Sequence, residues 1–339
     1  MEYRALGRTG VQVSKLCLGT MMFGAWGNHD HHDSARIIHR ALDAGINFVD
    51  TADIYSAGES EEIVGKALKS RRDDVVLATK FWGPMGDDPN RRGVSRRWII
   101  AEVENSLRRL GTDWIDLYQM HRPDPETDID ETLGALSDLV QQGKVRYIGS
   151  SSFSAGQIVE AQWTAHHRRL QRFRTEQPPY SMLVRGIELD VLPTAQPHGM
   201  GILTYSPLAG GWLSGRWTAE ATPTSPARKQ LAARFDMSLP ENQRKLEAVE
   251  QLARVADDAG LSLIELAIGF VVNHPAVTSA IVGPRTMEQL ESQLPAAAVA
   301  LDAAVLDRID QIVRPSVDLN PADTSYGEHL LEPTRRRRS

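Results

Sequence analysis

The chain is 339 residues long, and its 41% hydrophobic and 24% charged residues are typical of a globular protein with a substantial core, which excludes a chain disordered throughout. Its formal net charge of -6 excludes broad binding to a phosphate backbone, so we expect no nucleic-acid partner. No apolar stretch approaches the ~20 residues that span a bilayer, which argues against a membrane protein.

The single cysteine and the two ends of the chain bear on its compartment. Cys17 cannot form an internal disulfide and lies in an apolar run, where a thiol behaves as a small buried side chain. Residues 1–10 resemble neither a signal peptide nor a transit sequence. We therefore expect a soluble protein in a reducing compartment, the cytoplasm. Arg335–Arg338 is the only basic run, and we interpret it as a solvated end.

Eight short apolar runs, taken in chain order, predict eight β-strands. Four of the intervening segments carry apolar residues at three-to-four spacing, which predicts amphipathic helices. The predicted strands are 13–19, 46–52, 75–80, 115–121, 145–151, 173–177, 201–206 and 279–283. The predicted helices are 33–44, 59–69, 95–110 and 130–142, followed later by 241–259 and 262–273.

Residues at the helix ends support these predictions. Gly45, Gly111 and Gly143 come just after three of the helices, where a left-handed residue commonly ends a helix. Asp33 stands where the first helix begins and is the predicted N-cap.

Nearly continuous apolar strands that alternate with helices predict a parallel sheet covered on its faces. Eight such units favour an α/β fold, the (β/α)8 TIM barrel, as a single domain over residues 1–316, with a C-terminal tail at 317–339. The alternative, an open doubly wound sheet that binds a nucleotide, needs a G-x-G-x-x-G turn after its first strand, and the sequence has none.

Two segments fall outside the repeating pattern. Residues 3–13 predict a hairpin that plugs the bottom of the barrel, although a loose N-terminal arm fits nearly as well. Far more chain lies between residues 206 and 279, after the seventh strand, than one helix requires. Its part from 210 to 240 is rich in Gly, Pro, Ser and Thr, which is typical of a lid over an active face.

Polar residues end five consecutive predicted strands. They are Asp50, Lys80, His121, Ser151 and Gln177. Because the C-terminal ends of parallel strands meet at one mouth of a barrel, these side chains are expected to converge there, on the face that carries the active sites of such barrels.

Asp50 and Lys80 are expected to pair, because an unpaired charge buried between strands and helices is costly. A purely structural ion pair explains these two residues equally well. Tyr55, five residues after Asp50, is placed to reach Lys80, whose ammonium lowers the pKa of a phenol from about 10. A tyrosine beside such a pair is a tuned general acid. His121, at a neighbouring strand end, is placed to orient a substrate carbonyl.

The chain also resembles the aldo-keto reductase superfamily almost from end to end. A single D-T-A-x-x-Y match is weak, but the matching segments together are highly specific and occur in the order typical of the family. They are LGTMMFG (18–24), FVDTADIYSAGESEEIVGKAL (48–68), LATK (77–80), DLYQMHRPD (116–124), GKVRYIGSSSF (143–153), EQPPYS (176–181), TYSPLAGGWLSG (204–215) and IVGPRTMEQL (281–290).

The resemblance implies a (β/α)8 barrel that reduces an aldehyde or ketone with NADPH. By matching positions, Tyr55 is the expected proton donor, Lys80 and Asp50 the pair that lowers its pKa, and His121 the residue that orients the carbonyl. No metal is implied.

The resemblance also implies a set of cofactor contacts. Asp50, Ser151, Ser152 and Gln177 match positions around the nicotinamide ribose and carboxamide, and Tyr205 matches the aromatic residue that stacks on the ring. The remaining matches are Gly19, Thr20 and Met21 near the nicotinamide, Ser206, Pro207, Leu208, Gly210 and Gly215 along the pyrophosphate, and Gly283, Arg285, Gln289 and Gln293 at the adenosine end.

Arg285 is expected to bind the 2′-phosphate through its planar guanidinium, which favours NADPH over NADH; a surface residue at a helix start is the alternative. Ser152 and Gln293 depart from the asparagines that the family often has at these positions, which puts cofactor affinity in doubt more than activity. Met22, Trp26 and Trp82 are expected, from their positions alone, to contact a small carbonyl substrate.

Two other functions remain open at this point. The β subunits of voltage-gated potassium channels are similar in fold, so an NADPH-binding regulatory subunit with little turnover is the main alternative. A Schiff-base enzyme that uses Lys80 as nucleophile is disfavoured by the nearby Asp50 and Tyr55. The sequence leaves the substrate open, and a homo-oligomer is possible.

Overall fold

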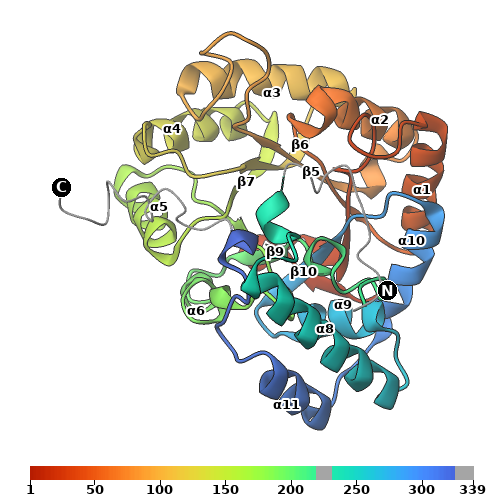
Figure 1. Cartoon of the computed structure of the whole chain (residues 1–339). Helices are drawn as coiled ribbons and strands as arrows, with labels where there is room; N and C mark the ends of the chain where they lie inside the picture. Colours follow the sequence, from red (N-terminus) through yellow and green to blue (C-terminus); the bar gives the residue numbers. More distant parts are fainter. Residues whose placement is uncertain (219–230, 325–339) are drawn as a thin grey trace.

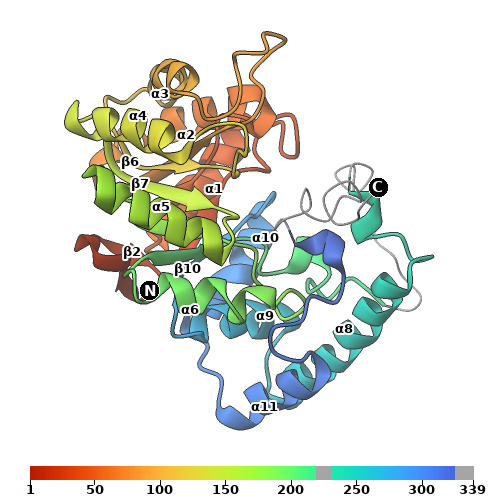
Figure 2. The same cartoon turned by 90° about the vertical axis from the view of Figure 1, so that its left-hand side faces the viewer.

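A computed structural model of the chain describes residues 1–218 and 231–324. Eight parallel strands close into a barrel in the order β10-β3-β4-β5-β6-β7-β8-β9, and helices surround it (Figures 1 and 2). The predicted (β/α)8 barrel is therefore confirmed. The strands are β3 (Leu16–Gly19), β4 (Phe48–Asp50), β5 (Val76–Phe81), β6 (Ile115–Met120), β7 (Val145–Ser151), β8 (Thr175–Gln177), β9 (Gly201–Thr204) and β10 (Val277–Val282).

The four early helices predicted from their apolar spacing are present, and each buries its apolar stripe against the barrel. They are α1 (His31–Asp43), α2 (Glu59–Leu68), α3 (Arg96–Leu110) and α4 (Ile129–Gln141). The later helices are α5 (Ala155–Arg168), α6 (Val191–Ala195), α8 (Pro240–Asp258), α9 (Leu263–Asn273), α10 (Met287–Gln293) and α11 (Ala303–Ile312).

The ends of these helices follow the predicted chemistry, with one correction. Gly45, Gly111 and Gly143 all have positive φ just after their helices, as expected. The N-cap of α1 is Asp30, not Asp33, because the Asp30 carboxylate accepts hydrogen bonds from the backbone N–H of His32 and Asp33. Asp33 lies within the first turn.

The N-terminal hairpin closes the bottom of the barrel, as predicted. β1 (Tyr3–Ala5) pairs antiparallel with β2 (Gln12–Ser14). Leu6 and Val13 are fully buried and pack against barrel-interior residues such as Phe48 and Leu117. This small second core fills the lower part of the barrel, so the polar interior is confined to the opposite end.

The segment after β9 is long, as predicted, but residues 219–230 lie outside the described part, so its role as a lid stays a prediction. Its described flanks pack inward, with Trp212 and Trp217 stacked at 3.8 Å between ring centroids. Buried Lys245 of α8 pairs with Asp323 at 2.6 Å. Asp323 belongs to the segment that the sequence assigned to a tail, and it is also buried.

Within residues 1–218 and 231–324, no helix is both long enough and apolar enough to cross a membrane.

Candidate active site

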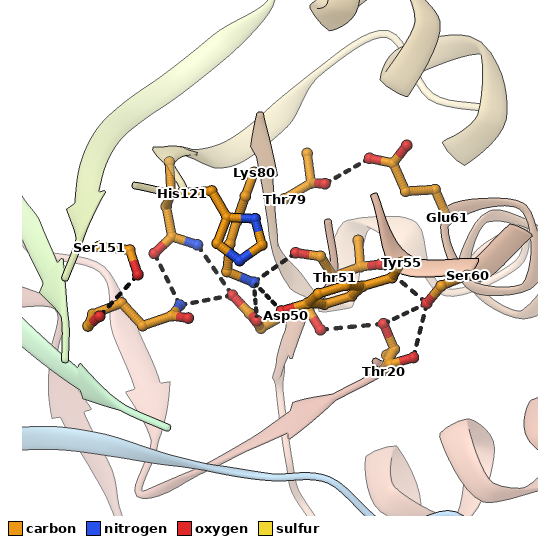
Figure 3. A network of polar contacts seen from close by, with 12 residues as sticks. Thr20, Asp50, Thr51, Tyr55, Ser60, Glu61, Thr79, Lys80, His121 and Ser151 are labelled. Carbon is orange, nitrogen blue, oxygen red and sulfur yellow. Dashed lines mark hydrogen bonds and ion pairs between the residues drawn. The ribbon is translucent and has the colours of Figure 1, made fainter. Parts of the chain in front are cut away.

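The site is centred on the buried ion pair between β4 and β5. Lys80 Nζ lies 2.5 Å from Asp50 Oδ1 and also donates to the backbone oxygen of Thr51 at 2.8 Å (Figure 3). The Lys80 side chain is fully buried and that of Asp50 is 3% exposed. Burial alone lowers the pKa of Lys80, but the Asp50 carboxylate and the Tyr55 hydroxyl raise it above its ordinary value, so the ammonium stays charged.

The second oxygen of Asp50 is held by two side-chain amides, one from β6 and one from β8. Gln119 Nε2 and Gln177 Nε2 donate to Asp50 Oδ2 at 3.0 and 2.9 Å, and Gln177 also donates to the Gln119 side-chain oxygen at 3.1 Å. Sequence reasoning missed Gln119. Alternation along β6 could have found it, because it lies two residues before His121 and thus on the same face of the strand.

Tyr55 reaches the pair from the loop after β4. Its hydroxyl lies 3.2 Å from Lys80 Nζ, and the ammonium also lies 4.9 Å from the centre of its ring. The predicted net lowering of its pKa is wrong for this structure, because burial raises the pKa above its ordinary value and the Lys80 charge opposes this only in part. The phenol is therefore protonated at neutral pH and can donate a hydrogen bond.

His121 follows the end of β6 and faces Tyr55. The two rings meet edge to face at 5.8 Å, and the imidazole lies above Lys80 in Figure 3. Burial lowers the pKa of His121 well below its ordinary value, and the charges of Lys80 and Arg122 act in the same direction. The imidazole is therefore neutral, and it can act as a hydrogen-bond donor without carrying charge.

A strained turn holds Tyr55 in place. Ser56 and Ala57 have φ of 49° and 56°, a left-handed conformation that non-glycine residues seldom adopt. Ser56 Oγ donates to the Phe23 carbonyl and accepts from the Trp26 N–H, which fastens the turn to the loop after β3. Because strained backbone of this kind persists only where surrounding contacts impose it, we infer that the position of Tyr55 is tightly specified.

That loop also places an aromatic wall at the mouth. The ring of Trp26, which is 47% exposed, lies 6.0 Å from that of Tyr55. Met22 and Trp82 are half-buried, and Met21 is exposed. Thr20 is buried and bonds to the backbone oxygen of Asp50. Trp26 is thus the predicted substrate residue that the structure places directly beside Tyr55.

The turn after β7 forms the next part of the mouth. Ser151 Oγ donates to the backbone oxygen of Gln177 at 2.9 Å, and Ser152 has a φ of 59°. Ser152 Oγ lies 3.3 Å from the Tyr205 hydroxyl and accepts a hydrogen bond from Arg122. Sequence reasoning missed Arg122, although it follows His121 directly. Its guanidinium lies 6.0 Å from the centre of the Tyr205 ring.

Beyond Tyr205 the backbone opens toward solvent. Ser206 is exposed with φ of 58°, and Gly210 and Gly215 also have positive φ. A side chain added at Gly215 would meet nothing within 4 Å. Pro207 is buried and Leu208 half-buried. The backbone is therefore accessible at Ser206, Gly210 and Gly215.

The residues predicted for an adenosine end lie after β10, in the turn before α10 and in α10 itself. The side-chain oxygen of Gln289 accepts from the Arg285 N–H at 2.8 Å, and the Arg285 carbonyl accepts from Asn28. Gln293 is buried, and its side-chain oxygen has no hydrogen-bond partner among the described residues. Gly283 is exposed with open space around it.

Residues 15–314 match the model of the aldo/keto reductase family. The uncharacterized oxidoreductase YrpG of Bacillus subtilis is 42% identical, over 92% of this chain and 96% of the relative. Aldo-keto reductase YhdN of the same organism is 37% identical over 99% of both chains. A probable voltage-gated potassium channel subunit beta of Arabidopsis thaliana is 36% identical, over 93% of this chain and 97% of the relative.

Proposed function

The chain belongs to the aldo/keto reductase family, and we propose that it reduces an aldehyde or ketone to the alcohol with NADPH. The observation that carries this proposal is the contact of the Tyr55 hydroxyl with Lys80, itself paired with Asp50, beside a neutral His121. Two relatives whose names describe oxidoreductases are consistent with it.

The residues around the mouth fit a nicotinamide cofactor. The unpaired oxygen of buried Gln293 offers an acceptor for the amino group of an adenine. The Arg285 guanidinium has no ion-pair partner among the described residues, which suits a 2′-phosphate. Ser151, Gln177 and Tyr205 would hold the nicotinamide end, and Ser206, Gly210 and Gly215 would face the pyrophosphate. When bound, the cofactor supplies the hydride.

The chain's own residues then handle the carbonyl oxygen. Tyr55 donates a hydrogen bond to that oxygen and gives up its proton as negative charge develops there. The Lys80 ammonium stabilises the phenolate that remains, and Asp50 keeps Lys80 charged and in position. Neutral His121 donates a second hydrogen bond that fixes the direction of the carbonyl. No further ionisable group is needed.

A second function rests on the channel-subunit relatives. Three of the relatives are described as probable or putative β subunits of voltage-gated potassium channels, at 34–36% identity. An NADPH-binding subunit with little turnover would use the same fold and the same cofactor contacts. The two functions differ in whether the protein turns over a carbonyl substrate with Tyr55 as the proton donor.

The test combines cofactor binding with turnover. Purified protein is titrated with NADPH and NADH by fluorescence, and oxidation of NADPH is then followed at 340 nm with a panel of aldehydes and ketones. Binding with turnover supports the reductase. Tight binding without turnover on the whole panel favours the subunit function, and absence of binding contradicts both.

A further inference from the structure

An arginine at the mouth forms no ion pair among the residues that the structure describes. Arg122 is half-buried at the end of β6, next to His121. In residues 1–218 and 231–324 no carboxylate lies within ion-pair distance of its guanidinium, whereas Lys80 is neutralised by Asp50. The charge of Arg122 acts on buried Glu176, but burial raises the pKa of that carboxyl to about 8, so Glu176 is mostly uncharged at pH 7 and leaves the charge of Arg122 unbalanced.

Most of the donors of this guanidinium are also unused. Its hydrogen bonds to the described residues run from Nη1 alone, to the His121 carbonyl and to Ser152 Oγ. Nε and Nη2 make none, and Arg122 is not fully enclosed. An arginine presents five N–H groups in a planar fork that matches a carboxylate through two parallel hydrogen bonds.

The positive charge of Arg122 influences the ionisation of both His121 and Tyr55. After burial and Lys80, Arg122 contributes to the lowered pKa of His121, and it also opposes the burial that raises the pKa of Tyr55. The rings of Trp26 and Tyr55 lie 6.0 Å apart and offer an apolar surface at the same mouth. A molecule whose carbonyl lies at Tyr55 would therefore have both an apolar surface and a cation within the mouth.

We propose that Arg122 selects carbonyl substrates that carry a carboxylate, with the aldehyde or ketone at Tyr55 and the acid group on the arginine fork. This inference rests on the reductase function proposed above and names its substrate class. A single unbalanced positive charge suits a monoanionic carboxylate better than a dianionic phosphate. The carboxylate is bound and does not react, so only the carbonyl is reduced.

The experiment compares two probes that differ by one charge. Values of kcat/KM with NADPH are measured for 4-carboxybenzaldehyde and for methyl 4-formylbenzoate, whose ester is neutral. The wild type is expected to prefer the acid by roughly ten- to hundredfold, the range of a charge-assisted hydrogen bond. Arg122→Gln is expected to lower kcat/KM for the acid at least roughly tenfold more than for the ester, and Arg122→Lys is expected to keep part of the preference for the acid.

Matched controls separate this role from others. Arg146→Gln removes an exposed arginine that lies over Trp114, and it should keep the full preference. The affinity of Arg122→Gln for NADPH should equal that of the wild type. An equal fall for both probes, or weaker NADPH binding, would assign Arg122 to the cofactor or the fold and overturn the proposal.

Two outcomes with the wild type are also decisive. Equal reduction of the two probes, or reduction only of aldehydes without a carboxylate, overturns the substrate class and leaves the reductase function standing. Absence of turnover with every carbonyl tested, despite bound NADPH, overturns the reductase function and the substrate class with it.

Discussion

Gln177 and Asp50 stand 127 positions apart in the chain, yet Gln177 Nε2 donates to Asp50 Oδ2 at 2.9 Å across the barrel. This contact, shared with Gln119, leaves Asp50 Oδ1 for Lys80. The residue expected to touch the nicotinamide thus also orients the carboxylate that holds Lys80 beside Tyr55. Gln177 thus links the proposed cofactor site to the proposed proton donor, and we expect a substitution of Gln177 to affect both cofactor binding and turnover.

Removal of the Tyr55 hydroxyl should abolish turnover and spare cofactor binding. Tyr55→Phe keeps the ring beside His121 and removes only the proton donor, so kcat is expected to fall by about 10²- to 10⁴-fold. NADPH oxidation and fluorescence titration measure the two effects. Tyr118→Phe is the matched control, because its buried hydroxyl has no hydrogen-bond partner among the described residues. Equal activity of wild type and Tyr55→Phe would remove Tyr55 from the mechanism.

Breaking the buried ion pair should cost more stability than removing it whole. Lys80→Met leaves Asp50 charged and buried, and we expect a loss of about 3–5 kcal/mol in the free energy of unfolding. The double variant Lys80→Met, Asp50→Leu should recover part of that loss. Urea titrations of the single and double variants measure the coupling. The exposed pair Arg308–Asp258 is the control, and its loss should cost at most about 1 kcal/mol.

Glu176 should make the stability of the protein depend on pH. Burial raises the pKa of its carboxyl to about 8, against hydrogen bonds from Ser150 and the Phe153 N–H that favour the charged form. Between the unfolded value, about 4.3, and the folded one, the folded state binds more protons, so stability falls as pH rises through this window.

Glu176→Gln tests this, because it keeps the shape of the protonated acid and cannot ionise. Its melting temperature should fall less between pH 6 and pH 8.5 than that of the wild type. Glu104→Gln, which removes a partly exposed carboxylate paired with Lys144, is the control and should follow the wild type. Parallel curves for wild type and Glu176→Gln would show that Glu176 is already ionised at pH 6.

Arg285 should decide between the two nicotinamide cofactors. Loss of a charge-assisted contact to a 2′-phosphate is worth about 1.5–3 kcal/mol, so Arg285→Ala should bind NADPH roughly ten- to hundredfold more weakly. NADH lacks that phosphate, and its affinity should stay unchanged. Fluorescence titrations with both cofactors make the comparison, with exposed Arg244→Ala as the control. Equal weakening for both cofactors would place Arg285 elsewhere on the cofactor or in the fold.

Local sequence patterns were sufficient to predict most of the strands and helices of this protein. Apolar runs of strand length, helical spacing and the glycines after three helices located the eight strands and the early helices, because these signals depend on neighbours in the chain. The rule that parallel strands direct their C-terminal ends to one mouth then brought Asp50, Lys80 and His121 together. The prediction of Asp33 as the N-cap was wrong. Capping depends on which carboxylate faces the free N–H groups at the start of the helix, and that carboxylate belongs to Asp30.

The sequence by itself determined the barrel, the family, and the residue types at the strand ends, since each follows from periodicity or from an ordered set of motifs. Only the tertiary structure decided how those groups ionise and what else they touch. Burial raises the pKa of Tyr55, whereas the neighbouring lysine taken alone predicts a lower pKa, and a sequence pattern does not measure burial. The contacts of Gln119 and Arg122 depend on side chains from different strands that meet at the mouth, at distances in space that separation along the chain does not encode.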